Sequence, residues 1–239
     1  MAGHSKWANI KHKKGRADAK KGKVFSRIAK EIISAVKQGG VDVKTNAKLR
    51  LVLQKAKAAN FPMDNVERNI KKASSSDQAD FQEVTYELYG HGGVGIIVDA
   101  MTDNKNRTAS EMRIATNKKG GHIASPGSVA FNFDRKGVIQ IAQDQAVEEE
   151  LFIQATDAGA DDFDTTDETF IVVTPADKLY EVKESLESAD IPIQDASLEM
   201  IPKNSVTCDA SMQKANQELL DWLEDLEDVD AVFHNMEEA

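Results

Sequence analysis

The 239-residue sequence has little cysteine, few aromatic residues and no long hydrophobic run, and each lack excludes a class of protein. Cys208 is the only cysteine, so an internal disulfide and a cysteine-rich zinc cluster are excluded. No stretch approaches 18 uninterrupted apolar residues, which excludes a membrane-spanning helix. The N-terminus has no apolar core of a secretory signal, so we expect a cytoplasmic protein with no membrane partner.

Apolar and charged residues are both plentiful. Hydrophobic residues make up 41% of the chain and charged residues 29%. This composition supplies enough apolar side chains for folded cores, and it excludes collagen-like, mucin-like and wholly disordered proteins. The length fits one to three small domains, and the aromatic content of 6% favours helical or α+β units.

Charge is divided unevenly along the chain. Residues 1–72 hold 19 Lys and Arg against 5 Asp and Glu, a balance of +14. Residues 73–239 hold the other 11 basic and 35 acidic residues, a balance of -24. Such segregation indicates a polyanionic partner for the basic part, whereas the acidic part would repel phosphates. A merely solvated surface is the alternative, and it explains segregation this strong poorly.

Residues 1–23 are expected to form a flexible basic arm, because their apolar content is too low to pack independently. Lys and Arg neutralise phosphates and release counterions, and interleaved aromatic rings can stack on exposed bases. Trp7 has an alternative role, which is to pack the arm onto the following helices. The predicted nucleic-acid-binding residues are Lys6, Trp7, Lys11, His12, Lys13, Lys14, Arg16, Lys20, Lys21 and Lys23.

Residues 24–76 are predicted to form a helical domain. Apolar residues at helical spacing predict a helix over 24–37, a second over 45–59 and a short third helix that starts near Pro62. Three short helices with brief connections favour a small bundle. No helix has the Arg, Asn and Gln content of an evident recognition helix.

Beyond residue 80 the hydrophobic period changes, which predicts strands alternating with helices. This recurrence favours two small ferredoxin-like α+β sandwiches, and a single larger α/β domain is the alternative. The expected strands cover 84–89, 95–102, 128–134, 137–141, 169–174, 193–201 and 229–234. The expected helices cover 104–119, 145–158, 176–188 and 211–226.

The sequence matches catalytic and cofactor-binding motifs only weakly. Residues 90–95 satisfy the G-x-G-x-x-G pattern, but a strand follows them where a dinucleotide site needs a helix. We therefore expect a hairpin or a bulge with glycines at positive φ. The five histidines lack metal-ligand spacing. We therefore expect no enzyme activity, cofactor or small-molecule substrate, although a divalent ion among the acidic residues of 148–150 and 221–230 remains an alternative.

Several separated segments, taken together, resemble the YebC/PmpR family of probable transcriptional regulatory proteins. These are MAGHSKWANIKHKK at 1–14, LYGHGG at 88–93, TDNKNRT at 102–108 and GSVAF at 127–131, and residues 200–202 and 232–235 also fit. The match covers nearly the whole chain in the right order. One departure is His91, where many relatives have proline.

The resemblance implies an α+β multidomain fold in which a three-helix domain is followed by two ferredoxin-like domains, one inserted in the other. After the arm at 1–23 and the helical domain at 24–76, domain two would cover 81–134 plus 204–239. Domain three would cover 135–203.

The resemblance also implies a non-enzymatic protein associated with nucleic acid. Bacterial members are regarded as DNA-binding regulators, mitochondrial relatives are translational activators, and some bacterial relatives are linked to the ribosome. We therefore expect a nucleic-acid-binding regulator of gene expression, with promoter DNA and ribosomal RNA both open as targets. A protein–protein adaptor with an acidic cleft is an alternative from another class, and a metal-dependent enzyme is the third.

Overall fold

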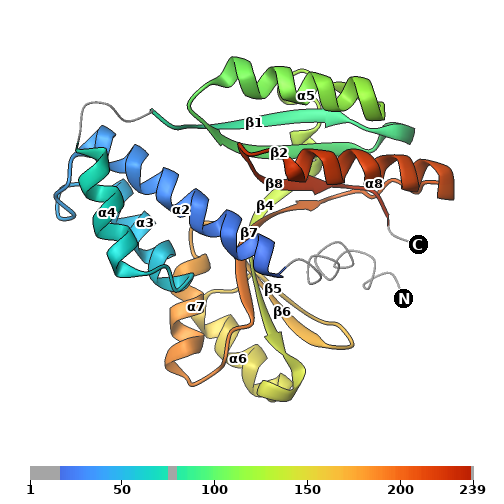
Figure 1. The fold of residues 1–239 in the computed structure, drawn as a ribbon. Coiled ribbons are helices and arrows are strands. Elements are labelled where there is room, and N and C mark those ends of the chain that lie inside the picture. Colours follow the sequence, from blue (N-terminus) through green and yellow to red (C-terminus); the bar gives the residue numbers. More distant parts are fainter. Residues whose placement is uncertain (1–16, 75–79, 238–239) are drawn as a thin grey trace. The chain divides into compact units, whose positions relative to one another are not determined.

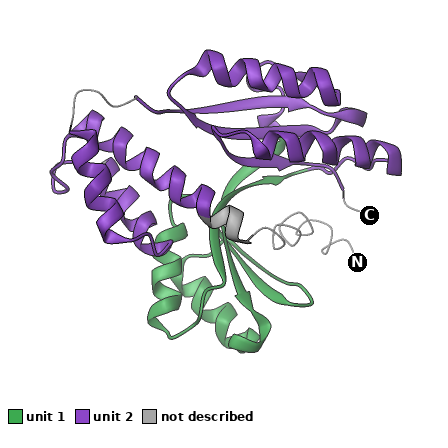
Figure 2. Cartoon of the chain, viewed as in Figure 1, with its two compact units in different colours: residues 1–6, 132–203 green, residues 7–131, 204–239 purple. Residues whose placement is uncertain are grey.

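The computed structural model describes residues 17–74 and 80–237 (Figure 1). The described residues divide into two compact units, which Figure 2 colours separately. Residues 132–203 make up unit 1, and the other described residues make up unit 2. None of the described helices is both long and apolar enough to cross a membrane.

Three helices begin unit 2, as the sequence predicts: α2 (Ala17–Gly39), α3 (Ala47–Ala58) and α4 (Met63–Ala73). Asn46 caps α3 by accepting the N–H of Leu49 at 2.9 Å, and its amide nitrogen donates to the carbonyl of Ala35 on α2. The amide nitrogen also donates to the carbonyl of Gly40, so this side chain caps α3 and ties it to the last turns of α2. The buried core contains Ile28, Ile32, Ile33, Ala35, Val36, Leu49, Val52, Ala56, Phe61, Val66 and Ala73.

The rest of unit 2 is an antiparallel sheet with two helices. Its strands are β1 (Gln82–Tyr89), β2 (Gly95–Thr102), β3 (His122–Ile123) and β8 (Val229–His234), in the order β3-β1-β2-β8. Helices α5 (Lys105–Lys119) and α8 (Ala210–Asp225) pack their apolar residues on this sheet. The shared core includes Leu88, Ile96, Val98, Met112, Leu219 and Leu223.

Unit 1 has the β-α-β-β-α-β order of a ferredoxin-like domain. Its elements are β4 (Phe133–Ala142), α6 (Glu148–Ala158), β5 (Asp162–Thr165), β6 (Thr169–Pro175), α7 (Leu179–Ser188) and β7 (Asp195–Pro202). The antiparallel sheet has the order β5-β6-β4-β7. The two sheets correspond strand by strand: β3, β1, β2 and β8 of unit 2 take the places of β5, β6, β4 and β7 of unit 1. The chain passes through these places in a different order in unit 2. The predicted α+β multidomain fold is thus confirmed.

Several predicted boundaries were wrong. Helix α2 begins at Ala17, so residues 17–23 are helical where a flexible arm was expected. The strand expected over 128–134 is replaced by a loop with a 3-10 turn at Ala130–Asn132, and one long strand, β4, follows it. Strands β3 and β5 were missed because two and four residues are too few to show a period.

Candidate nucleic-acid interface

The structure places three of the ten residues that the sequence predicts to bind nucleic acid. Lys20, Lys21 and Lys23 lie within the first two turns of α2. The other seven, which are Lys6, Trp7, Lys11, His12, Lys13, Lys14 and Arg16, lie outside the described residues. Nucleic-acid binding by all ten stays a prediction. The helical backbone at 17–23 places these lysines one and two residues apart along α2.

The helical bundle adds exposed basic residues beyond those ten. Helix α3 contains no acidic residue, and basic residues also occupy its last turn. Over residues 22–74 the exposed acidic residues are Asp42, Asp64 and Glu67. The positive charge therefore extends from the N-terminal segment onto the folded bundle. The exposed basic residues are Lys44, Lys48, Arg50, Lys57, Arg68, Lys71 and Lys72.

Two basic side chains of α3 are wholly or partly engaged by contacts within the bundle. Arg50 donates from one guanidinium nitrogen to the carbonyls of Val43 and Lys44, both at 2.9 Å. Lys55 forms an ion pair with the buried Glu31 at 3.0 Å. Reading of base edges in a groove depends on polar side chains aimed outward, most often a bidentate Arg. These contacts thus leave α3 better suited to phosphate attraction than to sequence reading.

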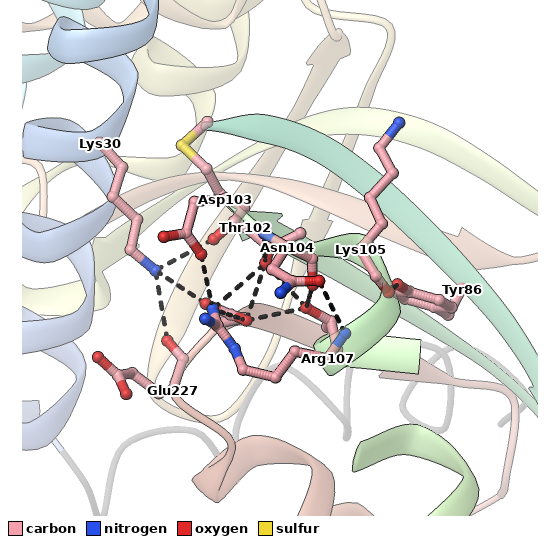
Figure 3. Close-up of polar contacts among 11 residues, drawn as sticks. Lys30, Tyr86, Thr102, Asp103, Asn104, Lys105, Arg107 and Glu227 are labelled. Atoms are coloured by element: carbon pink, nitrogen blue, oxygen red, sulfur yellow. Dashed lines mark hydrogen bonds and ion pairs between the residues drawn. The ribbon is translucent and has the colours of Figure 1, made fainter. Parts of the chain in front are cut away.

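A lysine of α2 joins the helical bundle to the edge of the sheet in unit 2. The amine of Lys30 donates to the carbonyl of Met101 at 3.1 Å and to that of Glu227 at 3.4 Å. It also lies 3.8 Å from the carboxylate of Asp228. Figure 3 shows Lys30 reaching from its helix toward Glu227 and the end of β2. Lys30 therefore contributes to the contact between α2 and the sheet.

Asp228 is the centre of a buried polar network that includes part of the TDNKNRT motif. Its carboxylate, only 4% exposed, accepts hydrogen bonds from Thr102 at 2.9 Å, Thr108 at 2.8 Å and Arg107 at 2.7 Å. Burial raises the pKa of Asp228, but these three donors outweigh it and hold the pKa below its ordinary value. Asn104 caps α5 beside them by accepting the N–H of Arg107 (Figure 3). The motif thus has a structural role in anchoring α5.

A second acidic residue, Asp230 on β8, lies close to α2. Its carboxylate is 8% exposed and lies 3.8 Å from the guanidinium of Arg27. Burial raises the pKa of Asp230 to about 6, and Glu31 and Asp99 raise it further, while Arg27 and Lys30 oppose the shift. The contact between the bundle and the sheet therefore holds a carboxylate that titrates near neutrality.

We expect the Asp230→Asn variant to change how stability depends on pH. A raised pKa in the folded state means that the group contributes stability below its ordinary pKa of 3.8 and loses it as pH rises through about 6. Between pH 5 and pH 7.5 the wild type should lose about 1 kcal/mol relative to the variant. Urea unfolding at both pH values measures this difference. An equal difference at the two pH values would contradict the assignment.

The glycine-rich turn at 90–95 is a hairpin connection, as predicted. It joins β1 to β2, and Gly92 and Gly93 have φ of 70° and 80°, which residues with a side chain rarely adopt. The N–H of His91 donates to the side chain of Asn216 at 2.7 Å, a bond that a proline at this position could not make. Sequence reasoning missed Asn216, which lies on α8 and is fully buried.

Cys208 is poorly suited to act as a nucleophile. Burial raises the pKa of the Cys208 thiol, and Asp209 raises it further, so little nucleophilic thiolate exists at neutral pH. Within 17–74 and 80–237, no three His, Cys, Asp or Glu residues gather in a group that could hold a metal ion.

Two family models together match most of the chain. The model described as "TACO1/YebC protein N-terminal domain" matches residues 5–76. The model described as "TACO1/YebC second and third domain" matches residues 81–236. The break between them falls at residues 77–80, between the helical bundle and the first strand of unit 2.

Relatives and a solved structure agree with these matches. A "probable transcriptional regulatory protein" of Protochlamydia amoebophila is 63% identical over 236 residues, which is 99% of this chain and 96% of the relative. Another protein so named, from Chlamydia pneumoniae, is 59% identical and is matched over 99% of this chain and its own full length. The crystal structure of a conserved hypothetical protein from Aquifex aeolicus is 42% identical. It matches with a TM-score of 0.79 over 97% of this chain and 96% of that one.

Proposed function

Because this chain belongs to the TACO1/YebC family, we propose that it regulates gene expression by binding nucleic acid through its basic N-terminal part. The resemblance noted from the sequence is confirmed by the family models. The relatives' name, probable transcriptional regulatory protein, supports a regulator and makes DNA the first target to test. We expect binding without catalysis.

The observation that carries this proposal is the positive charge of residues 1–72 and its continuation onto the exposed surface of α3 and α4. Lysine and arginine bind nucleic acid of any sequence by displacing the counterions condensed on the phosphates. The ten predicted binding residues supply the N-terminal portion of this charge, and the exposed lysines and arginines of the bundle extend it. Unit 1 is acidic and would stay away from the phosphates.

RNA is the second candidate target, and one feature of α3 favours it. One guanidinium nitrogen of Arg50 and the amine of Lys55 are bonded within the bundle, so the helix presents fewer groups that could read base edges in a DNA major groove. Binding dominated by phosphates and by stacking of aromatic residues such as Trp7 suits structured or single-stranded RNA as well. Sequencing of the nucleic acid crosslinked to the native protein in cells distinguishes promoter DNA from ribosomal RNA.

Binding should depend steeply on salt. For about six to eight phosphate contacts on duplex DNA, log K should fall with log salt at a slope of roughly -5 to -7. Replacing Lys20, Lys21 and Lys23 together with alanine should reduce the magnitude of this slope by about 3 and weaken binding about tenfold or more. Fluorescence anisotropy of a labelled duplex over a salt series measures both quantities, and the same series on an RNA hairpin compares the two targets.

A matched variant controls for the loss of three charges. Lys105, Lys118 and Lys178 are exposed and lie outside the basic N-terminal part. Their triple replacement with alanine should leave the slope unchanged. A slope near zero for the wild type, or an equal loss from both triple variants, would refute the proposed interface.

A further inference from the structure

Unit 1 has a charge opposite to that of the helical bundle. Residues 132–203 contain 18 Asp and Glu against 5 Lys and Arg, a net charge of -13. Like charges repel, so this unit disfavours nucleic acid and anionic membranes as partners and favours cationic ones. The exposed acidic residues include Glu148, Glu149, Glu150 and Asp157 on α6, and Glu181, Glu184 and Glu187 on α7.

The outer face of α6 carries large apolar side chains among these acids. Val147 at the N-cap is 62% exposed, Phe152 is 50% exposed and Ile153 is 58% exposed. Leu151 and Ala155 point into the core, so helical spacing places Ile153 on the opposite side, near Glu149 and Asp157. Phe152 lies about 100° round the helix from Ile153, and Val147 lies at the N-terminal end. We call these three exposed side chains, with the acidic residues of α6, the α6 face. Neighbouring exposed apolar residues with a charged rim are typical of a protein-binding surface.

Phe152, the aromatic residue of the α6 face, packs against further aromatic rings of unit 1. Phe152 contacts Phe163 on β5 edge to face with centroids 5.6 Å apart. Phe163 in turn stacks on Phe170 on β6, which is 4% exposed, at 5.8 Å. Because these contacts already restrict the ring of Phe152, it loses little conformational entropy when a partner covers it. Binding at this ring is therefore more favourable than at a freely moving side chain.

The neighbouring edge strand is blocked against addition of a further strand. In β5, the N–H groups of Phe163 and Thr165 alternate with those that pair with β6. They are bonded instead by the carboxylates of Asp162 at 2.9 Å and Asp164 at 2.8 Å. Charged residues at an edge prevent pairing with another chain. A partner at this end of unit 1 would therefore bind through side chains on the α6 face.

We propose that the α6 face is a docking surface for a basic protein segment that carries an apolar anchor. The occupant is identified by charge complementarity: lysines and arginines would meet the acidic residues of α6, and an apolar side chain would cover Phe152 and Ile153. This extends the proposed function, because a nucleic-acid-bound regulator would then hold a second, cationic protein through its acidic unit. It does not depend on which nucleic acid is bound.

The test uses the full chain and a defined probe. The probe is a labelled synthetic peptide of Lys, Ala and Leu whose leucines line one helical face, and its scrambled isomer has the same charge. The wild type should bind the amphipathic peptide about tenfold more tightly than the scrambled one, because only the former presents an apolar face. The Phe152→Ser/Ile153→Ser variant should lose this preference.

Matched variants separate a specific surface from general effects. Ile153→Ser alone removes an outward side chain without disturbing the contacts among the aromatic rings, and it should weaken peptide binding severalfold even if the double variant folds poorly. Leu51→Ser/Ile114→Ser removes two side chains of similar exposure in unit 2, and it should have no effect. An equal loss in this control, or equal binding of the scrambled peptide, would overturn the proposal.

Two further outcomes would assign the α6 face to a different occupant and would also overturn the proposal. The first is a wild-type dimer in sedimentation velocity that Ile153→Ser converts to a monomer, which would identify a second copy of the chain. The second is a loss of duplex DNA binding in Ile153→Ser, which would identify nucleic acid. The proposed function is tested separately through the lysines of α2, so the two proposals can fail independently.

Discussion

Asp228→Ala is expected to lower the free energy of unfolding by about 2–4 kcal/mol, because two buried hydroxyls lose their charged acceptor at once. The substitution leaves the hydroxyls of Thr102 and Thr108, which are 1% and 0% exposed, without their charged acceptor. It also removes a hydrogen-bonded partner of Arg107, whose pKa this carboxylate raises. Urea unfolding of the full chain measures the loss.

A matched variant uses the second acidic partner of the same arginine. Asp103 also binds Arg107 at 2.9 Å, but its side chain is 36% exposed and that of Arg107 is 45% exposed. Surface ion pairs contribute about 0–1 kcal/mol, so Asp103→Ala should cost far less. Similar losses in the two variants would show that Asp228 contributes no more than a surface charge.

The effect of Asp228 should also depend on pH. Its pKa is held below the ordinary value of 3.8, so its contribution to stability is present above that value and is lost as pH falls through the folded pKa. The difference in unfolding free energy between wild type and Asp228→Ala should therefore shrink on acidification. Unfolding measured at pH 7 and at pH 3 tests this.

Glu87→Ala is expected to lower the free energy of unfolding by about 2–4 kcal/mol, because several buried or half-buried donors lose a charged acceptor at once. The carboxylate accepts the backbone N–H groups of Gly127 and Val129, both at 2.6 Å, and of Ala130 at 2.8 Å. Amide hydrogen exchange provides a local measurement: exchange at Val129 and Ala130 should accelerate, because the loop opens more often.

The control for Glu87 lies on the same strand. Glu83 is an exposed residue of β1, and Glu83→Ala should change stability by no more than about 0.5 kcal/mol. Burial raises the pKa of Glu87, but the three N–H donors outweigh it and keep the pKa below 4.5. The contribution of Glu87 should therefore persist at neutral pH and be lost as pH falls through the folded pKa. Unchanged exchange in the 127–130 loop would contradict this role.

The Glu87 contacts also explain why the strand expected over 128–134 does not form at its start. The hydrophobic run from Val129 to Phe133 has the composition of a strand, but its first N–H groups point to a carboxylate on β1. Backbone groups that bind a side chain are unavailable to a neighbouring strand. The GSVAF segment is thus a loop shaped by a distant residue, and local composition could not reveal this.

Helices and longer strands were predictable because their signals are local. The strands at 95–102 and 229–234 have the predicted limits, and α5 differs from its prediction by one residue because Asn104 is its cap. Apolar spacing within each segment is enough to indicate these elements. The candidate interface was predictable in part: the sequence locates the positive charge, whereas the ion pair of Lys55 with Glu31 needs two helices to be packed together.

The sequence by itself determined the division of charge, the order of the helices and longer strands, and the glycine turn between β1 and β2. Each of these depends on residues that are close together along the chain. Only the tertiary structure decided the partners of Asp228, Asn216 and Glu87, which lie 126, 125 and about 40 residues from them. Asp228 and Asn216 meet their partners because the sheet places β8 beside β2 and α8 packs on it, and the pairing of β3 with β1 brings the following loop to Glu87. Local sequence does not show which polar side chains will be buried in this way and so need a partner.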